Sequence, residues 1–414
     1  MKRNNNKVGM SKTQKTNRTI WVNHTLRVCY VNPTILIKRP VSEISSRMAD
    51  AGLKTTVLFP KKVFRKFDES LHHSKLLNKS QIKTYSTFGI PFIKSEQALP
   101  FTPVFCYDSF KIFKENDIVH MWVPYYISNL HILLVKKLFY PKKKLILTMD
   151  TVPGYSFSMG KGADAVFKIY NKLFGWIIFR TPDVITLYGK SLVPYALKAG
   201  IPKDKIRVIS TGISMKTIDH KFREDVRKEF KIRQDTKIVV FAGLMVPRKG
   251  VEKIIAMAEH LKKENVVFLL AGDGPLKNKY IDDAKKLGLS NKMMFLGWRK
   301  DMPRLYQGSD ILVLPAEGEG LPGVVMEAMS YGVPCVASDI PCIPDLIEDG
   351  VSGFLCNKDN PKHFAEKIRL LVKNDFLRKK MGHAALSKIQ TFDWDDVIEK
   401  YKKLYDELYV RRDG

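Results

Sequence analysis

Short apolar runs recur along the chain, and segments with helical periodicity separate them. Each run is nearly continuous in apolar residues, which is typical of parallel strands whose two faces are both buried. A helix is predicted after the first run, because Val41, Ile44 and Met48 share one face and Gly52 follows them. The runs in the first half of the chain are residues 27–31, 55–59, 117–123, 144–149, 183–186 and 205–209.

The same alternation starts again at Lys237. Strands that alternate with helices indicate a parallel sheet covered by helices on both faces. We therefore predict an α/β chain with two Rossmann-like, doubly wound domains that face each other across a cleft. A ligand would bind in this cleft, at the carboxyl ends of the strands. The apolar runs of the second domain are residues 237–241, 266–271, 293–296 and 311–314.

The predicted domain limits follow the changes in this pattern. The first residues are polar and basic and lack the apolar stretch of a signal peptide, so a disordered leader is expected there. A charged linker is predicted at about 212–236. The predicted units are residues 1–22 (basic leader), 23–212 (N-terminal domain), 213–391 (C-terminal domain) and 392–414 (a last helix).

The net charge of +28 is distributed unevenly. Residues 1–220 hold 36 Lys and Arg against 13 Asp and Glu, a net charge of +23, whereas the rest holds 34 against 29, or +5. Lysines interleave with apolar residues in 136–144 and 167–172, and residues 173–179 are strongly apolar. Anionic lipid headgroups attract such segments by about 1 kcal/mol per Lys or Arg. We expect either ordinary solvated helix faces or contact with an anionic membrane surface, and nucleic acid is the least favoured partner.

The cysteines indicate whether the protein lies in a reducing or an oxidising compartment. None of the five lies in a Cys-x-x-Cys pair and their number is odd, which argues for a reducing compartment and against a zinc or disulfide framework. No stretch has the length and apolar content of a membrane span, so no transmembrane helix is predicted. These features predict a cytoplasmic protein, either free or peripheral on the cytoplasmic face of the membrane.

The most informative stretch is residues 314–339, where a strand, a loop, a helix and a second strand follow one another. Pro322 suits the first position of the helix, and Gly332 suits its end. Glu319 lies in the loop and Glu327 on the helix. Free amides at a helix start can hold a diphosphate, whereas the two carboxylates are suited to accept hydrogen bonds from the hydroxyls of a sugar and of a ribose. The arrangement predicts a nucleotide-sugar site.

The stretch Glu319-Gly-Leu-Pro-Gly-Val-Val-Met-Glu327, continued by Ala-Met-x-x-Gly-x-Pro, resembles the Glu-x7-Glu motif of the group 1 (GT4) retaining glycosyltransferases. The resemblance is specific in residues 237–355 and loose before residue 200. It implies a GT-B fold whose last helix crosses back to the first domain. It also implies a nucleoside-diphosphate sugar as donor, a glycan or lipid-linked acceptor, no required metal or other cofactor, and transfer with retention.

The resemblance assigns roles to the residues of the motif. Glu319 would contact the donor sugar as a catalytic residue, and Glu327 would bind the ribose. The amides of Gly320, Leu321 and Gly323 would help to bind the diphosphate at the helix start.

A cationic loop follows the first strand of the second domain. Lys249 matches the lysine of the family's Gly-Arg-Leu-x-x-x-Lys-Gly loop, but Leu244 stands where its arginine would be, so Arg248 is predicted to substitute. Both cations would hold the diphosphate, whose negative charge grows during transfer. Gly297 and Trp298 resemble the segment that receives the nucleotide base. The backbone near Gly297 could read the base edge, and Trp298 could stack on the base or simply pack.

The first domain departs from the family twice. The loop after its first strand has no glycine, and Lys38 and Arg39 in this loop either attract an anionic acceptor or are solvated charges. Asp150 follows the run of residues 144–149, where the family commonly has a histidine. Its carboxylate could act in catalysis by orienting the acceptor hydroxyl or by stabilising positive charge on the sugar. Alternatively, Asp150 caps a turn.

Two other functions remain open at this point. A nucleotide-sugar 2-epimerase would change the donor without any acceptor. A non-catalytic module would bind sugar or nucleic acid through the basic first domain.

Overall fold

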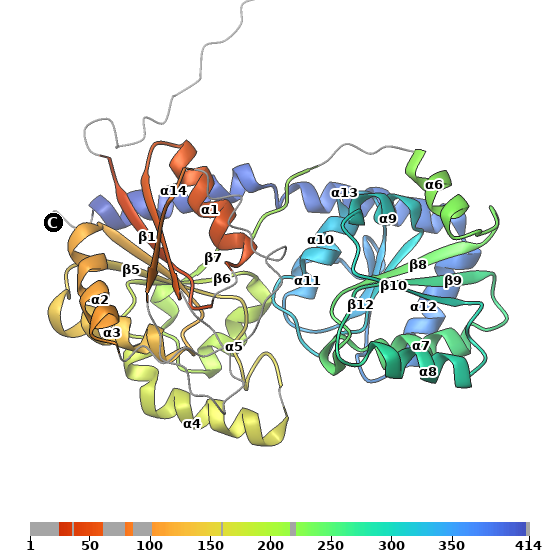
Figure 1. Cartoon of the computed structure of the whole chain (residues 1–414), viewed down its shortest axis with the longest axis horizontal. Coiled ribbons are helices and arrows are strands. Elements are labelled where there is room, and N and C mark those ends of the chain that lie inside the picture. The colour runs from red at the N-terminus through yellow and green to blue at the C-terminus, as the bar shows by residue number, and fades with distance from the viewer. Residues whose placement is uncertain are drawn as a thin grey trace, which may run out of the picture.

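The computed structural model describes residues 25–34, 37–60, 79–85, 102–158, 160–215 and 221–410. Within these residues the chain forms two parallel sheets that lie side by side, each with helices on both faces (Figure 1). The predicted fold class, two doubly wound α/β domains, is confirmed. The predicted basic leader, residues 1–22, lies outside the described residues.

The described part of the N-terminal domain contains a seven-stranded sheet with the order β3-β2-β1-β4-β5-β6-β7. The central strands are buried on both faces, which explains why their sequences are nearly continuous in apolar residues. The edge strand β3 is mostly exposed. The strands are β1 (Arg27–Val31), β2 (Lys54–Pro60), β3 (Gln81–Tyr85), β4 (Ile118–Trp122), β5 (Lys144–Met149), β6 (Val184–Leu187) and β7 (Ile206–Val208).

The C-terminal domain, as far as it is described, has a six-stranded sheet with the order β10-β9-β8-β11-β12-β13. In both sheets the chain first builds strands toward one edge and then returns to the centre to build toward the other. In open α/β sheets of this kind, ligands bind at the carboxyl ends of the strands, next to this point of return. The strands are β8 (Lys237–Ala242), β9 (Val266–Ala271), β10 (Met293–Gly297), β11 (Ile311–Leu314), β12 (Cys335–Ser338) and β13 (Gly353–Cys356).

Helices connect the strands and cover the sheets. In α1 the predicted apolar stripe of Val41, Ile44 and Met48 is fully buried, and Gly52 has a φ of +95° just after the helix end. The helices are α1 (Arg39–Asp50), α2 (Pro103–Glu115), α3 (Ile127–Phe139), α4 (Lys161–Ile178), α5 (Val193–Lys198), α6 (Lys221–Glu229), α7 (Val251–His260), α8 (Lys277–Lys286), α9 (Met302–Gly308), α10 (Gly323–Met329), α11 (Ile343–Leu346), α12 (Pro361–Lys373), α13 (Asp375–Gln390) and α14 (Trp394–Val410). Short 3-10 turns include η4 (Lys190–Leu192) and η6 (Pro247–Lys249).

The last helix, α14, returns to the N-terminal domain and lies beside α1 (Figure 1). Its Trp394 and Tyr401 are buried in the same apolar cluster as residues of α1 and β1. The hydroxyl of Tyr405 lies 2.8 Å from Nδ1 of the buried His120, whose Nε2 lies 2.7 Å from Thr148 Oγ1. The expectation that the last helix crosses back to the first domain is confirmed.

Two local expectations need correction. The region predicted as a linker, 212–236, contains helix α6, because its buried Arg227 pairs with the buried Asp310 at the start of β11 at 3.3 Å. Pro322 is not the first residue of α10 but its N-cap, since its ψ of 113° is extended. Among the described residues, no helix has both the length and the apolar content needed to cross a bilayer.

Candidate active site

The predicted site residues follow the carboxyl ends of four strands, two in each sheet. Lys38 and Arg39 come after β1, Asp150 after β5, Arg248 and Lys249 after β8, and Glu319 after β11. The carboxyl ends of parallel strands lie at the same edge of a sheet. Contacts between these loops, described below, bring the two edges together.

The loops after β8 and β11 meet in an ion pair. Lys249 Nζ lies 2.6 Å from Glu319 Oε1, and both side chains are largely buried. Arg248 lies 3.4 Å from the same carboxylate oxygen and donates a hydrogen bond to the carbonyl oxygen of Gly318 at 2.5 Å. Both cations and the loop carboxylate therefore lie together. That they bind a sugar diphosphate stays a prediction.

Two glycines allow the neighbouring chain segments to come this close to the loops after β8 and β11. Gly250 has a φ of +69°, and a Cβ atom there would lie only 2.1 Å from the carbonyl oxygen of Pro315. A Cβ atom at Gly318 would lie 1.9 Å from the ring of Phe157. That ring also lies beneath the Arg248 guanidinium, at 5.9 Å. Side chains at either position would force the loops apart.

Asp150 reaches the same place from the N-terminal domain. A Cβ atom built on Gly320 would lie 3.1 Å from Asp150 Cβ, so the backbone of the β11 loop passes directly over this aspartate. Lys38 Nζ lies 3.2 Å from Asp150 Oδ2. Burial pushes the pKa of Asp150 up, but the Lys38 ammonium and hydrogen bonds outweigh burial, so the pKa is lowered and the carboxylate is ionised at neutral pH.

Glu327 lies on α10, one helical turn from its start. Its Oε1 lies 3.0 Å from an Arg39 guanidinium nitrogen, and this ion pair joins the two domains. The hydroxyl of Tyr306 donates to its Oε2 at 3.2 Å. Burial and the nearby Glu327 carboxylate raise the pKa of Tyr306, which keeps this donor protonated.

The remaining predicted contacts lie at the helix start and farther along the sheet. Gly320, Leu321 and Gly323 lead into α10 as expected, and Leu321 is buried. Gly297 and Trp298 lie at the end of β10, which β9 separates from β8. Strand spacing places them about 10 Å from the β8 loop. The Trp298 side chain is 51% exposed, so it is not a core residue and is free to stack on a ligand.

Sequence reasoning missed Tyr306, Phe157 and a second contact between the domains. Lys190 N and Ser191 N of η4 donate to the Asp345 carboxylate of α11, at 2.8 and 3.2 Å. We refer to this contact as the Asp345 bridge. No spacing or composition signal marks these residues, because each acts through a partner that is distant in sequence.

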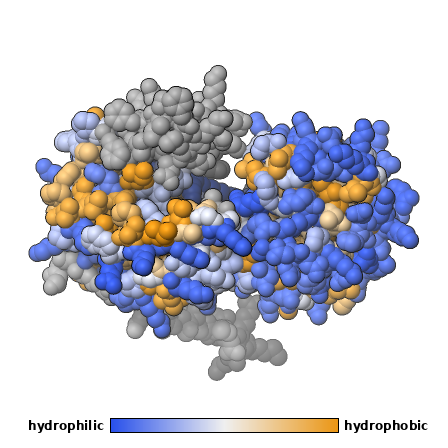
Figure 2. Space-filling model, turned by 90° about the horizontal axis from the view of Figure 1, so that it is seen from below, coloured by the Kyte–Doolittle hydropathy of each residue, from blue (hydrophilic) through white to orange (hydrophobic). Residues whose placement is uncertain are grey.

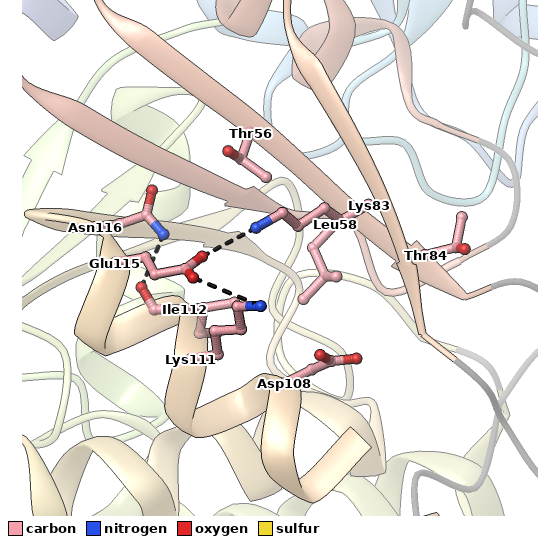
Figure 3. A pocket seen from close by; sticks show the side chains of 9 residues that line it. All are labelled: Thr56, Leu58, Lys83, Thr84, Asp108, Lys111, Ile112, Glu115 and Asn116. Carbon is pink, nitrogen blue, oxygen red and sulfur yellow. Dashed lines mark hydrogen bonds and ion pairs between the residues drawn. The ribbon is translucent and has the colours of Figure 1, made fainter. Parts of the chain in front are cut away.

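A cavity of about 240 Å³ lies elsewhere, between α2 and the strands β2 and β3 (Figure 3). Both of its lining lysines pair with one lining carboxylate. Glu115 lies 3.0 Å from Lys83 and 3.6 Å from Lys111. The cavity contains none of the predicted site residues, so we do not assign it to the candidate site.

Metal-ligating side chains do not gather in the described part of the chain. No group of three or more His, Cys, Asp or Glu residues within it could hold a metal ion. The expectation that no metal is required stays a prediction.

Comparisons with known proteins agree with the geometry. The family model described as "Glycosyl transferases group 1" matches residues 222–388. An uncharacterised glycosyltransferase of Methanocaldococcus jannaschii is 31% identical over 55% of this chain and 69% of its own length. The UDP-Gal:alpha-D-GlcNAc-diphosphoundecaprenol alpha-1,3-galactosyltransferase of Escherichia coli is 26% identical over 64% of this chain and 70% of its own length.

For two further relatives the match covers only 60% and 54% of the relative's own length, so the chain spans little more than half of those proteins. Among solved structures, Anabaena HepE in complex with UDP and glucose superposes with a TM-score of 0.73 at 16% identity. That comparison covers 92% of this chain and 100% of HepE, and it shows a shared fold.

Proposed function

Since the chain belongs to the group 1 glycosyltransferases, we propose that it transfers a sugar from a nucleoside-diphosphate sugar to an acceptor, with retention of the anomeric configuration. The observation that carries the proposal is the Lys249–Glu319 contact at 2.6 Å, next to Asp150 from the other domain. A phosphate-binding cation, a sugar-binding carboxylate and a second carboxylate thus share one site.

The donor would be held mainly by the C-terminal domain. Lys249 and Arg248 would bind the diphosphate, and the amides near the start of α10 would assist them. Glu319 would accept hydrogen bonds from sugar hydroxyls. A carboxylate offers about four lone-pair positions, so its contact with Lys249 leaves room for them. Glu327 would bind the ribose, with its orientation fixed by Tyr306 and Arg39.

The chemical step would use charges that are already in place. As the sugar–oxygen bond breaks, negative charge grows on the leaving diphosphate, and fixed cations stabilise that charge more in the transition state than in the ground state. The ionised Asp150 would stabilise positive charge on the sugar or orient the acceptor hydroxyl. The acceptor hydroxyl would form its bond to the anomeric carbon on the face from which the diphosphate leaves, which gives retention. The leaving diphosphate would take the hydroxyl proton. No step in this mechanism needs a metal.

The acceptor is proposed to be a glycan or a lipid-linked glycan. The E. coli relative is named for a diphosphoundecaprenol acceptor, and HepE was solved with UDP and glucose. These names support the class of donor and acceptor proposed here. Thermal-shift screening with UDP, GDP and ADP sugars identifies the donor, because a ligand that binds only the folded state raises the melting temperature.

The test of the site is Glu319→Gln, assayed by transfer of labelled sugar from the identified donor. We expect a loss of about 100-fold or more, because one preorganised polar contact to the reacting sugar is removed. Glu317→Gln is the matched control. Glu317 lies in the same loop but pairs with Lys253 and Lys358, so activity should stay near that of the wild type. Near wild-type turnover by Glu319→Gln would refute the assignment, and NMR of the product establishes whether the configuration is retained.

A further inference from the structure

The outward face of α4 is apolar although it is exposed. Its large side chains recur every three or four residues, so they form one stripe along the helix. The opposite face of the same helix packs Ile178 into the core. A solvated surface helix normally presents polar residues outward, and this helix does not. The exposed side chains are Val166 (65% exposed), Ile169 (58%), Leu173 (59%) and Trp176 (51%).

The apolar surface continues onto the end of α3. Leu138 and Phe139 are 67% and 59% exposed, and Lys137 Nζ lies 4.1 Å from the centre of the Trp176 ring. We call these two residues and the four on α4 the α4 face. Seen from below, hydrophobic residues gather over the N-terminal domain, on the side where α4 lies in Figure 1 (Figure 2). An exposed patch of this kind marks an interaction site.

Cations predominate in the segment that carries the α4 face. Residues 136–180 contain nine Lys and Arg against two Asp. Asp150 lies in the candidate active site beside Lys38, and Asp164 accepts a hydrogen bond from Ser158 at the start of α4. Lys168 and Lys172 flank the apolar stripe and are exposed.

We propose that the α4 face docks onto the surface of a bilayer that contains anionic lipids. A helix with an apolar outward face and flanking lysines lies in the plane of a membrane interface. Its apolar side chains enter the boundary between headgroups and acyl chains, and its lysines meet the anionic headgroups. Nucleic acid would satisfy the lysines but would leave Val166, Ile169 and Leu173 without apolar partners. Apolar and cationic groups together therefore select a lipid surface.

Docking would also bring the cleft to the membrane. α4 begins at Lys161, four residues after Phe157, and the Phe157 ring contacts Gly318 and lies under Arg248 in the candidate site. A lipid-linked acceptor would then reach the site from the bilayer surface. This last consequence rests on the proposed transferase function, whereas the docking itself does not.

The test is co-sedimentation of the full chain with vesicles of phosphatidylcholine alone, or with about one third phosphatidylglycerol. We expect binding to the anionic vesicles that weakens between about 50 and 500 mM salt, because screening reduces the attraction. Leu173→Ser with Trp176→Ser should weaken this binding by about tenfold or more. Leu370→Ser with Phe376→Ser is the matched control: both side chains are exposed in the C-terminal domain, and binding should not change.

The same vesicle assay tests the role of the lysines beside the α4 face. Lys168→Glu with Lys172→Glu should abolish the preference for anionic vesicles. Lys379→Glu with Lys380→Glu on α13, which changes the net charge equally, should leave it in place. Melting temperatures of all variants show that they are folded.

Three outcomes would overturn the proposal. One is the absence of binding to anionic vesicles, and another is equal loss of binding in the α4 variants and their controls. The third is a wild-type dimer in sedimentation velocity that the Leu173 and Trp176 changes convert to a monomer, since the α4 face would then join two copies of the chain. The assays measure binding and not sugar transfer, so their failure leaves the proposed activity untouched, and loss of activity leaves the docking untouched.

Discussion

The charged residues of the candidate site form ion pairs, and each ion pair joins segments that are distant in the sequence. Lys249 and Glu319 connect the β8 and β11 loops, while Arg39 and Glu327 connect the two domains. A charge that is already paired has given up part of its hydration on folding. Little reorganisation is then needed when a diphosphate or a sugar hydroxyl enters the site. Removing one partner leaves the other unpaired, which is why charge-neutral, isosteric substitutions are the more informative tests.

One residue outside the site makes stability depend on pH. Burial lowers the pKa of His120 to about 3, because no charged partner compensates the imidazolium among Tyr405, Thr148 and Trp122. The unfolded chain binds this proton near pH 6.5 and the folded chain does not. The contribution of the neutral His120 to the stability of the fold is therefore complete above pH 6.5. It is lost as the pH falls from 6.5 toward 3. Over this range the free energy of unfolding falls by at most about 1.4 kcal/mol per pH unit because of this one group.

Urea unfolding between pH 7.5 and 4.5 measures this slope. His120→Gln should unfold more easily at neutral pH, because it disturbs two buried hydrogen bonds, and it should lose less stability than the wild type on acidification. His383→Gln, at an exposed position on α13, should keep the wild-type slope. Identical slopes for the His120 variant and the wild type would show that the buried imidazole does not control acid sensitivity.

At the level of elements, the loops of the C-terminal sheet set the geometry of the donor site. Gly250 follows the turn η6, and its left-handed backbone brings the loop against the carbonyl of Pro315 in the neighbouring β11 loop. Glu317 N also donates to the Arg248 carbonyl oxygen at 2.9 Å. The cationic loop and the acidic loop are thus a single packed unit.

Gly250→Ala tests this packing. The substitution combines a left-handed residue with a backbone clash at 2.1 Å, so it should cost more than the roughly 1–2 kcal/mol of backbone strain alone and should weaken donor binding. Gly288→Ala is the matched control. Its φ is +64°, but an added Cβ would meet only the end of the Lys262 side chain, at 3.5 Å. Donor affinity, measured by thermal shift, should fall for the first variant and stay unchanged for the second. If Gly250→Ala binds the donor as tightly as the wild type does, the contact between the two loops does not set the donor site.

At the scale of the whole molecule, several contacts hold the domains together, beside those of Phe157 and Asp150 with the β11 loop. They include the helix α14, the Arg39–Glu327 ion pair and the Asp345 bridge. The bridge is tight, since a Cβ atom at Gly189 would lie 2.2 Å from the Asp345 carboxylate. The residues proposed to bind the donor lie mostly in one domain and Asp150 in the other. On this proposal, the relative position of the domains decides whether the site is complete.

Asp345→Asn should therefore lower turnover more than donor binding. The substitution replaces one acceptor oxygen of the bridge by a donor, which loosens the contact with η4. A small displacement of Asp150 relative to the donor site can cost a large factor in rate, and we expect a drop in kcat of roughly tenfold with little change in donor affinity. Asp359→Asn, at an exposed position of the same domain, should leave both unchanged. A large loss of donor affinity with unchanged kcat would instead make Asp345 part of donor binding.

The sequence by itself determined the two sheets and the place of most candidate residues. Near-continuous apolar runs indicate strands buried on both faces, and the order of strands and helices indicates parallel sheets whose carboxyl ends gather the loops. The motif from Glu319 to Glu327 and the cations after β8 could be located in this way. Local pattern was enough, because burial and turn geometry act on residues that are close in the chain.

Only the tertiary structure decided which charges meet. The packing of the two domains decides whether Arg39 reaches Glu327, whether Phe157 lies under Arg248 and whether the Asp345 bridge forms. The apolar stripe of α4 shows the same limit. Periodicity fits a helix with either face inward, and only packing against the sheet shows that Leu173 and Trp176 are left outside. Contacts between residues this far apart in the sequence are fixed by the free energy of the whole packed molecule, and no local pattern encodes them.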